Sequence, residues 1–106
     1  MQSTGKKRTR YLEKLGLEET TVVHFDIPEG QPGKRWKLHR FLHGRVERRK
    51  LKGSTKLYRY PGLLHEGGFR MGQSVYMLPP ELASRLIVEL RDLGVRHRWW
   101  DVYTRG

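Results

Sequence analysis

The stretch Thr20-Thr-Val-Val-His-Phe-Asp-Ile27 decides the fold of this chain of 106 residues. Valine, threonine, isoleucine and phenylalanine favour extended backbone, and Pro28 ends the stretch because proline has no N–H to donate to a strand ladder. We therefore expect a β-strand over residues 20–27. Successive side chains of a strand point to opposite faces, which gives this strand an apolar face of three residues: Val23, Phe25 and Ile27.

Two amphipathic helices are expected after this strand. The first covers residues 34–43, where apolar side chains recur at helical spacing, and it stops at Gly44. The second opens at Pro79-Pro-Glu81 and is capped by Gly94. Along the second helix runs a stripe of leucines spaced three or four residues apart: Leu82, Leu86, Leu90 and Leu93. Each helix therefore offers an apolar face that can pack on a sheet.

Further extended segments are expected at residues 56–60, 69–78 and 95–104. The order of strand, helix, one or two strands, helix and strand predicts an α+β fold. Its expected form is a ferredoxin-like βαββαβ unit, an antiparallel sheet with two helices on one face. The other face then needs a cover, which a homodimer would supply. Adjacent Trp99 and Trp100 point to opposite faces of the last strand, so one of them can anchor that dimer.

The chain is expected to hold one domain with two appendages. Residues 1–19 are expected to form a flexible basic N-terminal segment, with a lead-in helical turn that ends at Gly16. The ferredoxin-like domain covers residues 20–106. Within it, residues 45–68 are basic and interrupted by glycines and prolines, so we expect an irregular insertion there.

Half of the cationic residues lie between Gly30 and His65. The formal net charge of the chain is +11, and this third of its length holds eleven cations against the single acid Glu47, a net charge of +10. The eleven cations are Lys34, Arg35, Lys37, Arg40, Arg45, Arg48, Arg49, Lys50, Lys52, Lys56 and Arg59. A segment of one sign is costly in self-repulsion but complements a polyanion. These residues therefore predict a surface that contacts the phosphates of DNA or RNA, largely independently of base sequence.

Other interpretations of this basic segment stay open. The cations could form a solvated face, or they could dock on an acidic partner protein. Tyr58 and Tyr60 alternate with Lys56 and Arg59. These tyrosines are suited either to stack on unpaired bases or to pack on a sheet.

Three motifs of the chain resemble a known family: Val22-Val-His-Phe-Asp-Ile-Pro28, Gly33-Lys-Arg-Trp-Lys-Leu-His-Arg-Phe-Leu42 and Gly72-Gln-Ser-Val-Tyr-Met77. Together they are similar to the CRISPR-associated Cas-two family and to the C-terminal module of PaaX-type transcriptional regulators. The resemblance spans residues 20–104, while residues 1–19 have no Cas-two counterpart and residues 45–68 are longer and more basic than the Cas-two connection. It implies a ferredoxin-like homodimer that binds DNA, partners an integrase of the Cas-one type and places Asp26 opposite its symmetry mate.

The same resemblance implies metal-dependent nuclease chemistry at Asp26. Magnesium prefers oxygen ligands, and two Asp26 carboxylates across a dimer axis could hold one ion that activates a water for attack on a phosphodiester. In the alternative interpretation Asp26 starts the turn that follows the strand or pairs with an arginine. His24 shares the strand face of Asp26 and is either a proton-transfer or metal-binding residue or a packed one. Whether the protein is an enzyme stays open; binding requires no cofactor, and magnesium enters only with the nuclease.

Other site classes lack their motifs. The chain has no cysteine, and no zinc spacing arises from its remaining histidines: His39, His43, His65 and His97. Phosphate-binding glycine loops, dinucleotide fingerprints and nucleophilic triads are also missing from the sequence. No run approaches the roughly 18 apolar residues of a transmembrane helix, and the N-terminus lacks a signal-peptide pattern. These features predict a cytoplasmic protein without membrane contact.

Overall fold

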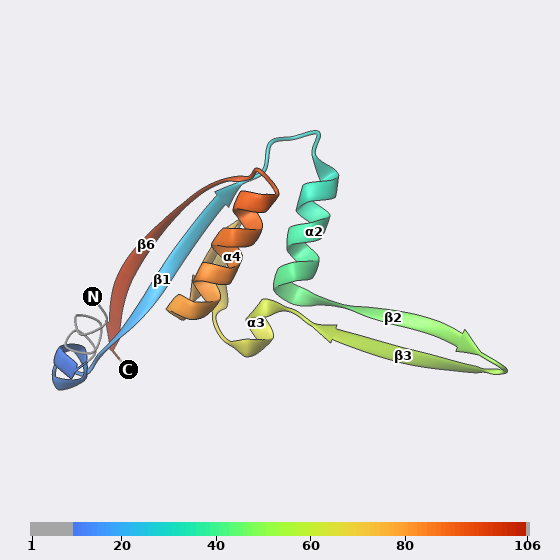
Figure 1. Cartoon of the computed structure of the whole chain (residues 1–106), viewed down its shortest axis with the longest axis horizontal. Helices are drawn as coiled ribbons and strands as arrows, with labels where there is room; N and C mark the ends of the chain where they lie inside the picture. Colours follow the sequence, from blue (N-terminus) through green and yellow to red (C-terminus); the bar gives the residue numbers. More distant parts are fainter. Residues whose placement is uncertain (1–9, 106) are drawn as a thin grey trace.

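The computed structural model describes residues 10–105, and Figure 1 shows how they are arranged. A short helix over residues 10–14 leads into the first strand, in agreement with the helical turn expected before Gly16. Residues 1–9 of the expected flexible segment lie outside the described residues. Nine further elements follow in chain order: β1 (Leu17–Asp26), α2 (Pro32–His43), β2 (Gly44–Leu51), β3 (Ser54–Pro61), α3 (Leu63–Glu66), β4 (Phe69–Gly72), β5 (Val75–Leu78), α4 (Pro80–Asp92) and β6 (Arg96–Arg105).

Four strands form one antiparallel sheet in the order β4-β5-β1-β6. The first strand, β1, pairs with β6 along its whole length and with β5 on its other side. The predicted α+β class and the antiparallel sheet are therefore confirmed. The element order differs from the predicted βαββαβ, because two further strands and the short helix α3 stand between α2 and β4. Those two strands, β2 and β3, form a separate sheet of their own.

The core lies between one face of the four-stranded sheet and the helices α2 and α4. Its side chains form a single buried cluster: Val23, Phe25, Leu38, Leu42, Leu63, Tyr76, Leu78, Ala83, Leu86, Leu90 and Val95. Removing this apolar surface from water is the main stabilising contribution, at about 25 cal/mol per Å². The apolar face predicted for the first strand is confirmed by Val23 and Phe25, and Ile27 packs against the cluster. The predicted leucine stripe is confirmed as well, since Leu86 and Leu90 are fully buried.

The helices α2 and α4 both lie on the core side of the sheet, so neither covers its opposite face. Val22 is paired with Met77 on one side and Trp100 on the other, and paired residues of neighbouring strands share a face. Phe69 extends this apolar row to β4 through its pairing with Met77. Phe69 is 55% exposed and Trp100 is 50% exposed. Trp99 pairs with Val23 and so belongs to the helix side, which confirms that the two tryptophans point to opposite faces.

Residues 44–61 form a regular β-hairpin where the sequence predicted an irregular insertion with one strand at residues 56–60. The prediction was wrong for β2 because its run of basic residues lacks the apolar alternation by which strands are recognised. Pairing with β3 creates the strand, in a register that runs from Gly44↔Pro61 to Leu51↔Ser54. The two turn residues, Lys52 and Gly53, have φ of 25° and 83°, as a tight hairpin turn with positive φ at both positions requires.

The other expected elements agree with the structure to within a few residues, with one exception. Residues 69–78 form the two short strands β4 and β5 rather than one extended segment, and the turn Gln73-Ser74 joins them. Ser74 adopts φ of 60°, which is uncommon for a residue with a side chain. None of the described helices has the length and apolar character needed to cross a membrane.

Residues 44–61, here named the basic ribbon, project from the helical layer (Figure 1). The radius of gyration is 17.5 Å, against about 13 Å for a compact domain of this length. Gly44 and Gly62 fix the base of the ribbon, since a Cβ on Gly62 would collide with the Leu42 carbonyl oxygen and the Gly44 nitrogen. Gly44 has φ of 80° and ψ of −169°, a region that only glycine enters readily. The direction of the ribbon is therefore set by backbone contact.

Candidate nucleic-acid interface

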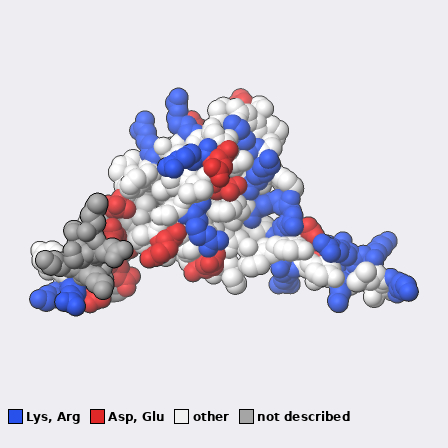
Figure 2. Space-filling model, in the orientation of Figure 1, with Lys and Arg blue, Asp and Glu red and all other residues white. Residues whose placement is uncertain are grey.

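The basic ribbon concentrates the cations that the sequence assigned to phosphate binding. Seven of the eleven lie on it, with Glu47 as its one acid, a net charge of +6. Figure 2 shows these lysines and arginines in blue along the projecting ribbon. No side chain of the ribbon belongs to the buried core cluster. The cations are therefore carried by an exposed two-stranded structure and not by an irregular loop.

One side of the ribbon is braced by contacts within the protein. Arg45 and Arg49 each place a terminal guanidinium nitrogen 3.2 Å from a carboxylate oxygen of Glu47. The guanidinium carbon of Arg45 lies 4.4 Å from the ring centroid of Tyr60, and that of Arg49 lies 4.7 Å from the ring centroid of Tyr58. The hydrogen bond that Arg49 donates to Glu47 raises the pKa of Arg49 above its ordinary value. These five residues, the braced face, satisfy one another, and both tyrosines are engaged in packing against arginine.

The other side of the ribbon, the open face, has no such network. It consists of residues whose side chains alternate with those of the braced face: Val46, Arg48, Lys50, Leu57 and Arg59. Within the described residues, no acid lies at ion-pair distance from its three cations. Val46 is 60% exposed and Leu57 is 53% exposed, so the aliphatic side chains between the cations also face solvent. The open face therefore combines unneutralised positive charge with accessible apolar surface.

Of the four predicted cations of α2, two lie beside the ribbon and two lie away from it. Arg40 stacks over Trp36 with its guanidinium carbon 4.1 Å from the ring centroid and reaches to 4.0 Å from Glu47. Lys37 lines the same shallow depression beside the ribbon as Arg40. Arg35 lies elsewhere, lining the pocket beneath the helix, and Lys34 is half-buried. The structure thus joins Arg40 to the braced face and separates Arg35 from it.

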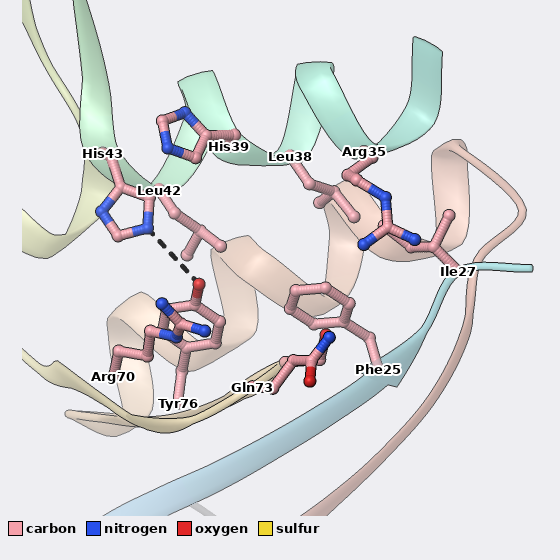
Figure 3. Close-up of a pocket in the computed structure, with 11 residues that line it drawn as sticks. Phe25, Ile27, Arg35, Leu38, His39, Leu42, His43, Arg70, Gln73 and Tyr76 are labelled. Atoms are coloured by element: carbon pink, nitrogen blue, oxygen red, sulfur yellow. Dashed lines mark hydrogen bonds between the residues drawn. The ribbon is translucent and has the colours of Figure 1, made fainter. Parts of the chain in front are cut away.

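Three neighbouring pockets connect the ribbon with the end of β1. The ribbon-base pocket, of about 580 Å³, is lined by Val46 and Arg59 of the open face and by His39 and His43 of α2. The central pocket, of about 320 Å³, lies beneath α2 and shares His39 and His43 with it (Figure 3). A third, the Asp26 pocket, shares residues of the central pocket and ends at His24 and Asp26. Shared lining residues therefore place the three pockets next to one another, between the base of the ribbon and Asp26.

Asp26 lies at the last position of β1 with its side chain exposed. Its register partner across the sheet is Arg96, but the two side chains form no ion pair, so the interpretation in which Asp26 pairs with an arginine is not confirmed. His24 is half-buried on the same side of the strand. Among the described residues there is no group of three or more side chains that could hold a metal ion. One chain therefore supplies one carboxylate here, and the paired arrangement that the resemblance implies stays a prediction.

The sequence did not indicate that His39, His43, Arg70 and Tyr76 line one pocket. His39 and His43, which appear scattered along the chain, lie one helical turn apart on α2 with ring centroids 4.7 Å apart. Nε2 of His43 lies 3.4 Å from the Tyr76 hydroxyl, in hydrogen-bond contact. Arg70 of β4 reaches the same pocket. The spacing of four between the histidines was a usable signal, whereas Arg70 and Tyr76 join them only through the pairing of β4 with β5.

Comparison with known proteins adds no relative to this geometry: no protein-family model matches the chain, and neither a curated protein nor a solved structure matches it significantly.

Proposed function

We propose that this protein binds nucleic acid through the open face of the basic ribbon. The observation that carries the proposal is the division of the ribbon into two sides. The arginines of the braced face are held by Glu47 and two tyrosines, whereas the open-face cations have no acid within reach in the described part of the chain. Exposed cations contribute little to stability, and unpaired ones on a projecting structure are suited to neutralising the phosphates of a polyanion.

The shape of the ribbon supports a nucleic acid over a flat acidic surface. Each of its strands has eight residues, a length of roughly 26 Å at about 3.3 Å per residue. A duplex major groove, roughly 12 Å wide, admits a two-stranded ribbon. Phosphates then lie on either side of the inserted structure, within reach of Arg48, Lys50 and Arg59. Contacts of this kind position the protein without reading the base sequence.

The architecture proposed for the remainder of the chain is ferredoxin-like. Without the basic ribbon and α3, the element order is β1-α2-β4-β5-α4-β6, and we infer that the ribbon is an insertion into such a βαββαβ unit. The proposed homodimer would cover the apolar sheet face that holds Val22, Met77 and Trp100. Trp100→Glu should then shift the sedimentation coefficient from dimer to monomer. A sedimentation coefficient already monomeric in the unmodified protein would remove the dimer.

Nuclease activity at Asp26 remains a prediction of the resemblance to Cas-two proteins. In the form that the resemblance implies, the Asp26 of a second chain supplies the second carboxylate, and the two together with retained waters hold one magnesium ion. The test is magnesium-dependent cleavage of DNA and RNA, with Asp26→Asn expected to abolish cleavage and retain binding. Absence of cleavage in the unmodified protein would eliminate this activity.

The binding proposal is tested by fluorescence anisotropy with matched duplex and single-stranded DNA and RNA over a salt series. Removing three cations of the open face (Arg48→Ala, Lys50→Ala, Arg59→Ala) should lower the magnitude of the slope of log affinity against log salt by about 2 to 3 on duplex DNA. The control removes three exposed cations elsewhere (Arg85→Ala, Arg91→Ala, Arg105→Ala) and has the same net charge. Equal losses in both variants would refute the assignment to the open face.

If the unmodified protein binds none of the four nucleic acids at low salt, the proposal fails as a whole. The acidic-protein interpretation of the ribbon would then take its place.

A further inference from the structure

The central pocket lies between α2 and the strands β1 and β5, beside the core and separate from the open face of the basic ribbon (Figure 3). Its volume of about 320 Å³ is at the lower end of the range for small-molecule sites, which runs from roughly 300 to 1,000 Å³. A pocket of this size accommodates one small ligand.

The floor of the pocket is apolar and closely packed. The rings of Phe25 and Tyr76 are stacked, with centroids 5.7 Å apart and planes 7° from parallel. Leu38 and Leu42 descend from α2 toward them, and each is 1% exposed (Figure 3). This surface complements a planar ring or another compact apolar group.

The rim of the pocket is cationic and rich in hydrogen-bond donors. Arg35 enters from α2 and Arg70 from β4 (Figure 3), and none of the eleven lining residues is acidic. Arg70 uses Nε to donate to the Gly72 carbonyl oxygen at 3.0 Å, which leaves its terminal nitrogens for another acceptor. Arg35 has no ion pair within residues 10–105. The side-chain amide of Gln73 adds a neutral donor, so the rim is suited to an anion.

The behaviour of His43 agrees with an excess of positive charge in this pocket. Partial desolvation of its ring, followed by the charges of His39 and Arg70, lowers the pKa of His43 from its ordinary value. The groups around it are His39 on the same helix, Arg70 on β4 and the Tyr76 hydroxyl on β5. An anion bound between these groups would offset the repulsion and raise the pKa of His43.

We propose that the central pocket binds a nucleoside monophosphate, either free or as the phosphorylated end of a nucleic-acid strand. The phosphate is recognised by Arg35 and Arg70, and the apolar floor receives the flat part of the nucleoside. The inference rests on the proposed function for its choice of nucleotide among ligands that combine an anion with a ring. Its second support is proximity, since the central pocket shares His39 and His43 with the ribbon-base pocket, which Val46 and Arg59 of the open face also line. A strand held by the ribbon can therefore reach this pocket with its end.

The first experiment titrates the full chain with adenosine 5′-monophosphate and follows the His43 imidazole and Tyr76 ring signals by NMR. Saturable shifts at both residues and a higher His43 pKa in the bound state are expected. Arg35→Gln and Arg70→Gln should each weaken binding by about tenfold, the effect of losing one charge-assisted hydrogen bond. The matched control is Arg85→Gln, which removes an arginine that is paired with Glu66 at 2.7 Å outside the pocket and should leave affinity unchanged.

Two comparisons in the same titration define the ligand. Adenosine and inorganic phosphate should each bind more weakly than the monophosphate, because each engages only the floor or only the rim. No saturable shift with the monophosphate, or equal affinity for inorganic phosphate alone, would overturn the assignment. Unchanged affinity in both Arg35→Gln and Arg70→Gln would overturn it as well.

The second experiment distinguishes a free nucleotide from a strand end and separates this inference from the proposed function. Single-stranded oligonucleotides that differ only in a terminal phosphate or hydroxyl are compared, and the phosphorylated strand should bind more tightly if strand ends are the ligand. The variant that lacks Arg48, Lys50 and Arg59 should lose oligonucleotide affinity and keep affinity for the monophosphate. A protein that binds the monophosphate and no oligonucleotide would refute the ribbon proposal and retain the pocket; the reverse result would refute the pocket alone.

Discussion

The four-stranded sheet and the basic ribbon are both antiparallel, yet they are stabilised in different ways. The sheet is covered on one face by α2 and α4, and its core side chains are buried. No strand residue of the ribbon is fully buried. Because a two-stranded hairpin without an apolar core is marginal in water, the ribbon depends on the Glu47 network and on its glycine base. The sheet sequence therefore serves stability, whereas most of the ribbon sequence is available for contact with a partner.

The largest expected effect separates the two regions by their stability. Leu86→Ala removes a fully buried side chain of α4 and should lower the free energy of unfolding by about 2–5 kcal/mol. Leu57→Ala removes the same atoms from the open face, where the side chain is 53% exposed, and should change it by no more than about 0.5 kcal/mol. Urea denaturation measures both. Similar losses of unfolding free energy in the two variants would mean that Leu57 of the ribbon contributes to stability as a core residue does.

The junction of the two regions is expected to be the next most sensitive place. Gly44→Ala should destabilise the fold in two ways. Alanine in the backbone conformation of Gly44 costs about 1–3 kcal/mol, and its Cβ would collide with the Tyr60 carbonyl oxygen. Gly53→Ala is the matched control, because Gly53 has a similar φ of 83° and open space around its Cβ position. We expect Gly44→Ala to be the more destabilising substitution in urea. Equal effects would show that the ribbon base tolerates movement.

The same contrast explains how much of the fold was predictable. The sheet and helices follow from local patterns, since Val23 and Phe25 alternate along a strand and Leu86 and Leu90 recur along a helix. The ribbon lacks both patterns, because cross-strand partners such as Glu47↔Tyr58 replace an apolar face. The strand β2 forms only because it pairs with β3, and no pattern among neighbouring residues of β2 indicates this pairing.

The candidate site was predictable in its charge and not in its geometry. Arg45 and Arg48 are equivalent cations in the sequence, and the structure places the first beside Glu47 and leaves the second on the open face. The two arginines are three residues apart, so in a strand their side chains point to opposite faces. This difference can be predicted only once the segment is known to be a strand. The central pocket was harder still to predict from the sequence, because Arg35 and Arg70 line it from separate elements.

A smaller effect on stability is expected when Glu47, the carboxylate of the braced face, is neutralised. Glu47→Gln releases Arg45 and Arg49 and should cost less than about 1 kcal/mol of stability, because the ion pairs are partly exposed. Affinity for duplex DNA at low salt should rise, since two arginines gain freedom to contact phosphates. Glu66→Gln makes the same change of charge in the pair with Arg85 and should raise affinity less. Anisotropy in low salt compares the two, and a decrease with Glu47→Gln would show that the brace organises the binding surface.

The smallest expected effect is a pH dependence at His43, which lies where the two regions meet. Its pKa in the folded protein is lowered, chiefly by partial desolvation, so the folded state binds fewer protons than the unfolded state below the ordinary value of 6.5. The stability that this group contributes is therefore complete above about pH 6.5 and is lost as the pH falls through the lowered folded-state value. The effect is small because the His43 side chain is largely exposed.

His43→Gln should remove this contribution, so the midpoint of urea unfolding should change less between about pH 5 and pH 7 than in the unmodified protein. His65→Gln is the control, since His65 lines the ribbon-base pocket without touching Tyr76 and should leave the pH profile unchanged. An unaltered profile in His43→Gln would mean that the junction does not sense protonation. A saturating anion in the central pocket should flatten the profile of the unmodified protein in the same direction, because it returns the His43 pKa toward its ordinary value.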